Sequence, residues 1–234
     1  MNGFVKNATV VLVHGAWADG SSWSRLVGPL KETGLGVICA PMPLTSLADD
    51  IAAVTRVVER IDGPILLAGH AYGGAPIAGV TSEKVKGLVY IAALAPDEGE
   101  TVGEVFFREK PHAQAPQLTP DAQGFIWMPE TGFIDAFAHH ADAETLAILH
   151  AIQRPIQVKC IQEKAPVPAW KAKPAWYFVA EDDRMIAPNT QHFMAERMKA
   201  TVRSRFVDHT PAITAPGHVV QFLIEAADAT LRSD

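Results

Sequence analysis

The sequence predicts an α/β protein whose core is a mostly parallel sheet flanked by helices. Short apolar runs begin at Ala8, Ile65, Gly87 and Ala175 and lack polar alternation, as expected for parallel strands covered on both faces. Segments with a helical apolar stripe separate these runs, which is the order of βαβ units. The chain has 234 residues, of which 48% are hydrophobic and 20% charged, enough for one sizeable core.

Turn and capping signals delimit the elements along the chain. Gly34 and Gly36 end the first helix, and Ser46 precedes Asp49 with capping-box spacing, Asp replacing the usual Glu. Gly63 and its neighbours turn the chain into the third strand. The expected strands are 8–13, 37–40, 65–68, 87–94, 175–180 and 203–207. The expected helices are 22–33, 47–60, one that begins near 75, 142–152, 189–199 and 216–231.

Between residues 96 and 174 the alternation of strands and helices gives way to a proline-containing stretch with short helical pieces. We expect an insertion that lies over a core formed by residues 1–95 and 175–234. Its aromatic residues are more numerous than a solvated loop needs, and some of them must pack it onto the sheet. They are Phe106, Phe107, Phe125, Trp127, Phe133 and Phe137. The insertion is expected to close a largely apolar pocket and to set substrate choice.

Composition and charge exclude several classes of function. The formal net charge is -6 and no Lys/Arg block stands out, so nucleic acid is not an expected partner. No apolar run reaches the length of a membrane span, and residues 1–7 lack the pattern of a signal peptide. Cys39, in an apolar run, is expected to be a buried free thiol, so a cytoplasmic protein is expected. Oligomeric state is left open.

Several histidines of the insertion are potential metal ligands. His139 and His140 are adjacent, and His112 and His150 lie in the same insertion. No His-x-x-x-His spacing with a nearby carboxylate accompanies them, so the sequence predicts no metal site and no cofactor.

The stretch Gly69-His70-Ala71-Tyr72-Gly73 joins a strand to the start of a helix. A strand, a sharp turn and a helix form the context in which a G-x-S-x-G motif presents a nucleophilic serine. The two glycines remove side chains that would collide with neighbouring backbone at a strained turn. The central residue here is Ala71, which has the shape of serine without its oxygen. A natural loss of function could relax the turn with Gly or Asn, so Ala71 favours a Ser→Ala replacement.

Residues that follow other strands complete a hydrolytic arrangement. His209 follows the last strand and is the candidate base, and Asp183 follows the strand before it and is the candidate orienting acid. Asp182 is the alternative acid. The backbone N–H groups of Ala16 and Tyr72 are the candidate donors to an oxyanion. His14 and His70 are expected to make structural hydrogen bonds.

These motifs resemble the α/β-hydrolase superfamily. The segments Val13–Trp17, Gly69–Gly74 and Asp208–Pro211 are similar to its small bacterial esterase-like branch, which is related to plant methylesterases and hydroxynitrile lyases. The likeness covers nearly the whole chain and is weakest across about 100–170, the cap in that family. It implies an α/β-hydrolase fold with a helical or irregular cap insertion. It also places the nucleophile at Ala71, the base at His209, the acid at Asp183, and the oxyanion hole at Ala16 and Tyr72.

The leading hypothesis is a serine hydrolase that cleaves a small hydrophobic or aromatic ester or lactone. With alanine at position 71 it would bind substrate and scarcely turn it over. The expected pocket residues are Trp17, Phe125, Trp127, Phe133 and Phe137. Two alternatives stay open: a lyase or other cofactor-free enzyme that uses only the His209–Asp183 dyad, and a non-enzymatic ligand-binding protein.

Overall fold

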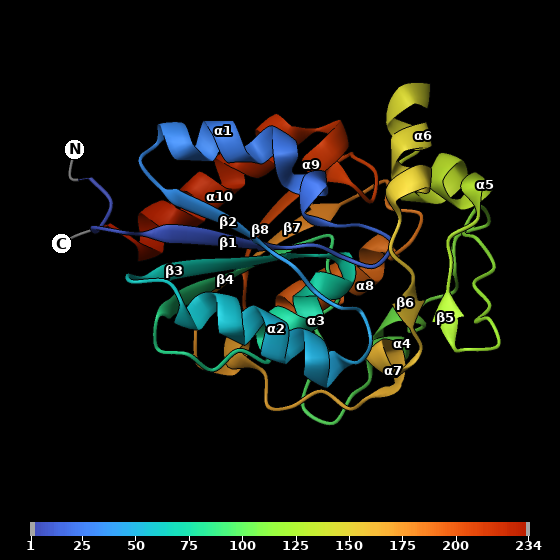
Figure 1. Cartoon of the computed structure of the whole chain (residues 1–234), viewed down its shortest axis with the longest axis horizontal. Helices are drawn as coiled ribbons and strands as arrows, with labels where there is room; N and C mark the ends of the chain where they lie inside the picture. The colour runs from blue at the N-terminus through green and yellow to red at the C-terminus, as the bar shows by residue number, and fades with distance from the viewer. Residues whose placement is uncertain (1–2, 233–234) are drawn as a thin grey trace.

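A six-stranded parallel sheet forms the centre of the structure, a computed structural model that describes residues 3–232 (Figure 1). The strands are β1 (Thr9–Val13), β2 (Gly36–Ala40), β3 (Ile65–His70), β4 (Val85–Ile91), β7 (Ala175–Ala180) and β8 (Thr201–Arg205). Their order is β2-β1-β3-β4-β7-β8, and every pair is parallel. Strands β1, β3 and β7 are buried along their whole length, which is why they read as continuous apolar runs. The predicted parallel sheet is confirmed.

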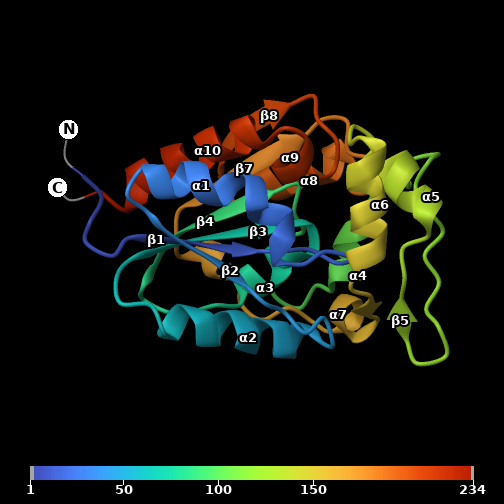
Figure 2. The same ribbon diagram turned by 45° about the horizontal axis from the view of Figure 1, so that its top comes forward.

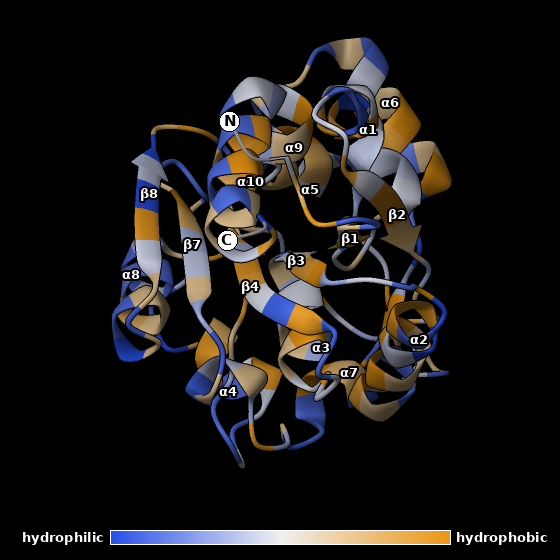
Figure 3. Cartoon of the chain, turned by 90° about the vertical axis from the view of Figure 1, so that its left-hand side faces the viewer, coloured by the Kyte–Doolittle hydropathy of each residue, from blue (hydrophilic) through white to orange (hydrophobic). Residues whose placement is uncertain are grey.

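Helices cover both faces of the sheet, and Figure 3 shows the two helical layers from the end of the strands. One layer holds α1 (Ser24–Glu32), α9 (Pro211–Thr214) and α10 (Pro216–Thr230). The other holds α2 (Leu47–Glu59), α3 (Gly74–Ala78) and α8 (Pro188–Arg197). The Ser46 side chain caps α2 by accepting the N–H of Asp49. No helix within residues 3–232 is both long and apolar enough to cross a membrane.

β3 continues to His70, beyond the expected residue 68, whereas β4 and β8 both begin and end earlier than expected. β4 ends at Ile91, before the expected residue 94, because Ala92 has a φ of 44° and leaves the extended conformation. β8 covers residues 201–205, whereas 203–207 was expected. This strand lies at the edge of the sheet and is mostly exposed, so its hydrophobic pattern carries little register information.

The segment 96–174 lies mainly at the carboxyl ends of the strands, as Figure 1 shows for α5, α6, β5 and β6 and Figure 2 for α5, α6 and β5. β5 and β6 form a separate antiparallel pair. Its elements are α4 (Val102–Phe106), β5 (Phe125–Ile126), α5 (Glu130–Gly132), a π-helical turn (Phe133–Phe137), α6 (Ala143–Ile152), β6 (Ile156–Gln157), α7 (Lys159–Gln162) and a 3-10 turn (Ala169–Lys171). We propose that this segment is a cap on a core formed by residues 1–95 and 175–234.

Candidate active site

A strained turn joins β3 to α3 and presents Ala71. Ala71 has a φ of 50°, in the left-handed region that residues other than glycine rarely adopt. A Cβ on Gly69 would lie 2.5 Å from the carbonyl oxygen of Gly73, and a Cβ on Gly73 would lie 2.6 Å from that of His14. Backbone from the turn and from β1 therefore packs where side chains would stand, which accounts for both glycines of the motif.

Ala71 faces an apolar cavity of about 260 Å³. The cavity is lined by three further residues that the sequence analysis selected for chemistry, Ala16, Tyr72 and His209. They come from the segment after β1, from the turn itself and from the loop after β8. Parallel strands end at the same edge of a sheet, so residues distant in the sequence meet there.

His209 and Asp183 form a buried hydrogen-bonded pair. The Nδ1–H of His209 donates to Asp183 Oδ2 at 2.8 Å, and the two side chains are 2% and 0% exposed. Asp183 Oδ1 accepts the backbone N–H groups of Met185 and Ile186, each at 2.8 Å. Gln191 donates to Oδ2 as well, at 2.8 Å. Because Nδ1 is the donor, Nε2 of a neutral His209 ring carries the lone pair that a general base needs.

The alternative acid, Asp182, turns to a different pair of side chains. Its Oδ2 lies 2.9 Å from His139 Nε2 and 3.0 Å from His140 Nε2. The geometry therefore favours Asp183 over Asp182 as the partner of His209.

The segment after β1 offers one backbone donor to the cavity. The N–H of Trp17 donates to the carbonyl oxygen of Arg154 at 3.0 Å, so this amide is occupied. Within the described chain, the N–H of Ala16 has no protein acceptor. Tyr72 is the second residue of a short 3-10 turn (Ala71–Gly73), and the first amides of a helix lack an intrahelical acceptor. Ala16 and Tyr72 both line the cavity beside Ala71, so their N–H groups remain the candidate donors to an oxyanion.

The Tyr72 side chain belongs to a buried polar group that the sequence analysis missed. Its hydroxyl donates to Asp50 Oδ2 at 2.7 Å, and Cys160 Sγ lies 3.6 Å from the same oxygen. Asp50 also accepts the N–H of Leu44 at 2.8 Å and is 0% exposed. Burial, more than any other cause, raises the pKa of Asp50. Asp50 could have been found from the sequence, because the helical periodicity of α2 places this carboxylate on the apolar face of the helix.

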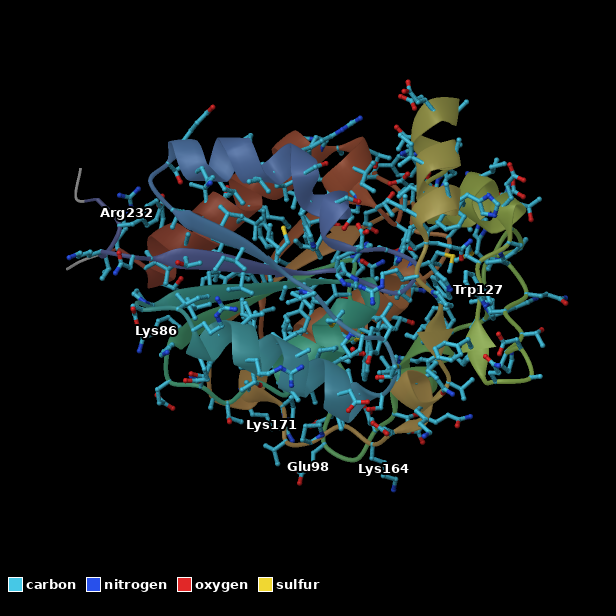
Figure 4. All side chains as sticks on the ribbon, in the orientation of Figure 1. Lys86, Glu98, Trp127, Lys164, Lys171 and Arg232 are labelled. Atoms are coloured by element: carbon cyan, nitrogen blue, oxygen red, sulfur yellow. The ribbon has the colours of Figure 1, made fainter. Side chains whose placement is uncertain are left out.

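Of the five aromatic residues expected in the pocket, Trp17 and Phe137 line the cavity. Phe125, Trp127 and Phe133 do not, which corrects the prediction. Ile126 faces the cavity, and its neighbours in an extended segment point the other way. Trp127 is accordingly 52% exposed, and Figure 4 labels it in the cap. Phe133 is fully buried and packs against Phe137, with ring centroids 5.2 Å apart.

The cavity wall is almost entirely apolar. Besides the residues already placed there, it contains Leu94, Val102, Phe106, Phe107, Leu118, Pro120, Ile156, Val158, Ile161, Gln162, Met185 and Ile186. Many of these come from the insertion, whose irregular elements gave little periodic signal. The centroid of the Phe137 ring lies 5.2 Å from that of the His209 ring and 6.2 Å from that of the Trp17 ring. Trp17 is held by a bond from its Nε1–H to the carbonyl of Ile126, at 2.9 Å.

Two further buried histidines, His14 and His70, donate hydrogen bonds to backbone carbonyl oxygens near the turn. His70 donates its Nε2–H to the carbonyl oxygen of His209 at 2.7 Å. His14 donates its Nδ1–H to the carbonyl oxygen of Gly15 at 2.9 Å. Burial, reinforced by the nearby His209, lowers the pKa of His70 to about 3. Burial also lowers the pKa of His14. Both rings therefore stay neutral in the folded protein at ordinary pH.

The neutral His70 makes stability depend on pH. The unfolded chain protonates this histidine below about 6.5, whereas the folded protein does so only near 3. Between these values the unfolded state binds more protons at this residue, so His70 alone should lower the free energy of unfolding by about 1.4 kcal/mol per pH unit as pH decreases. Urea denaturation at several pH values measures this slope. The His70→Gln variant should lose stability less steeply by about that amount, and equal slopes in the two proteins would contradict the assignment.

Comparison with known proteins agrees with this architecture. The model of the "Alpha/beta hydrolase family" matches residues 10–232. The Arabidopsis thaliana protein named "Putative methylesterase 14, chloroplastic" is 22% identical over 249 residues, which covers 93% of this chain and 71% of the relative. Polyneuridine aldehyde esterase superposes with a TM-score of 0.84 at 18% identity, covering 95% of this chain and 100% of its own. A pyrethroid hydrolase from Sphingobium faniae gives a TM-score of 0.82 at 22% identity, covering 95% and 98%.

Proposed function

This chain belongs to the alpha/beta hydrolase family and has esterase-type relatives, and we propose that it is a serine-type carboxylic ester hydrolase with alanine at the nucleophile position. One observation carries the proposal: Ala71 is held at the strained turn and shares a cavity with His209, whose ring is oriented by Asp183. A protein that only bound a ligand would not need an imidazole oriented in this way.

The proposed reaction follows from the groups around Ala71. With serine at this position, His209 Nε2 would take the hydroxyl proton while the oxygen attacks the ester carbonyl carbon. The N–H groups of Ala16 and Tyr72 would stabilise the negative charge that develops on the carbonyl oxygen. The protonated His209 would return the proton to the leaving alcohol, and water would then release the acid. Alanine supplies no attacking oxygen, so the chain as it stands binds the ester without cleaving it.

The cavity supports a small ester or lactone with a hydrophobic or aromatic acyl or alcohol group. Apart from His209 and Tyr72, the lining side chains with polar groups are Gln162 and Trp17, and the Nε1–H of Trp17 already donates to the carbonyl oxygen of Ile126. The few polar groups can orient a carbonyl but leave charged substituents without partners, and burying an unpaired charge is costly. The named activities of the relatives, methylesterase, polyneuridine aldehyde esterase and pyrethroid hydrolase, agree with ester substrates.

A serine-directed aryl phosphonate tests the proposal directly. The Ala71→Ser variant should bind it covalently, one phosphonyl group per chain, and intact mass measurement detects the adduct. The unaltered chain should gain no mass. An unmodified Ala71→Ser protein with native circular dichroism would overturn the serine mechanism. Activity that requires His209 in the unaltered chain, insensitive to phosphonate, would instead favour dyad-only chemistry.

A further inference from the structure

A second cluster of titratable side chains lies outside the cavity, where the segment 133–141 meets the loop after β7. His139 Nε2 and His140 Nε2 lie 2.9 Å and 3.0 Å from Asp182 Oδ2. One nitrogen or oxygen from each residue falls within 4.8 Å of the other two. The His139 side chain is 5% exposed, Asp182 22% and His140 38%, so one ligand is anchored in the protein and the others open to solvent.

We propose that His139, His140 and Asp182 bind a divalent transition-metal ion of the Zn²⁺ class. Two imidazole nitrogens and one carboxylate oxygen are ligands that suit zinc and its neighbours, whereas Mg²⁺ and Ca²⁺ need a shell of oxygens. Three protein ligands leave a fourth position for water, which the exposed side of His140 and Asp182 can admit.

The distances and charges suit such an ion. Tetrahedral Zn²⁺ with bonds of about 2.0–2.2 Å requires ligand atoms about 3.3 Å apart. The two distances from Asp182 Oδ2 to the histidine nitrogens, 2.9 Å and 3.0 Å, need to lengthen by only a few tenths of an ångström, and the ligand atoms of the two histidines lie within 4.8 Å of each other. Two charged side chains lie near these ligands. Asp208 accepts the backbone N–H of His140 at 3.0 Å, and the positively charged Arg184 lies near Asp182.

The proposed site joins the insertion to the core. His139 follows the π-helical turn that ends with Phe137, and Asp182 lies 43 residues further along the chain, after β7. A bound ion would fix this junction and so raise the temperature of unfolding, because the unfolded chain does not hold the three ligands together. The inference is independent of ester hydrolysis, because Asp183 and not Asp182 holds His209.

Titration calorimetry of the chelator-treated protein with Zn²⁺ alone tests the site. We expect one bound ion per chain, a higher unfolding temperature, and no comparable effect of Mg²⁺. Co²⁺ should give the intense visible absorption of a tetrahedral complex. His140→Ala and Asp182→Asn should each weaken Zn²⁺ binding by more than the roughly 10- to 100-fold that loss of a supporting residue costs.

His192→Ala is the matched control. His192 forms a similar 2.9 Å contact with Glu181 on the surface, yet no third ligand accompanies that pair among the described residues. Its loss should leave Zn²⁺ affinity unchanged. His140 is partly exposed, so its replacement should preserve the fold, and circular dichroism checks this. The proposal would be overturned if the unaltered protein did not bind Zn²⁺. It would also be overturned if His140→Ala and Asp182→Asn bound Zn²⁺ as tightly as the unaltered protein does.

Discussion

The Ala71→Ser variant is expected to hydrolyse a short aryl ester on the order of a millionfold faster than the unaltered chain, the factor that removal of the nucleophile costs a serine protease. The turn already holds residue 71 at a φ of 50° beside the cavity, so serine needs no backbone change. The added oxygen is the one missing reactant. Release of p-nitrophenol from an acetate or butyrate ester, measured as kcat, checks the prediction.

The matched control for this experiment is Ala71→Gly. Glycine adopts positive φ more readily than alanine and should preserve the turn, but it supplies no oxygen. It should therefore be as inactive as the unaltered chain. If the folded Ala71→Ser protein cleaves no member of a broad ester panel, the esterase proposal fails.

Removing the imidazole of residue 209 should be nearly as damaging as removing the nucleophile. In the Ala71→Ser background, we expect His209→Ala to lower kcat by a factor also on the order of a million, because the hydroxyl then has no base. Asp183→Asn should cost less, about ten-thousandfold, because the base remains but its tautomer is no longer held. Steady-state kinetics with the same aryl ester measures both effects.

Replacement of His218 provides the comparison for the loss of His209. This histidine is exposed at the start of α10 and lies outside the cavity lining. His218→Ala in the Ala71→Ser background should leave kcat within about twofold. A substitution at an exposed position usually changes the free energy of unfolding by no more than about 0.5 kcal/mol, so the site should keep its geometry. A His209→Ala variant that retains most of the activity would show that another group acts as base.

Local backbone physics made much of the core accessible to sequence analysis. The apolar runs of β1, β3 and β7 could be read directly, because strands covered on both faces have little place for polar residues. The Ser46 cap of α2 was recognisable from spacing. The turn at Ala71 was recognisable from its glycines, whose positions follow from steric contact with adjacent backbone.

Direction and long-range contact were less accessible. Phe125 and Trp127 were expected to face the pocket, but Ile126 between them does so, and a two-residue strand has too little periodicity to show this. The bond between Tyr72 and Asp50, and the cluster of His139, His140 and Asp182, join segments far apart in the chain. The spacing of residues along the sequence does not predict contacts of this kind.

Periodicity, capping and turn sterics act over a few residues, so the parallel sheet and the turn around position 71 could be predicted from the amino-acid sequence. The insertion residues that line the cavity, and the partners of Asp182 and Asp50, became evident only in the folded structure. Those contacts depend on how an irregular segment packs against the sheet, and this packing is set by shape and burial across the whole molecule.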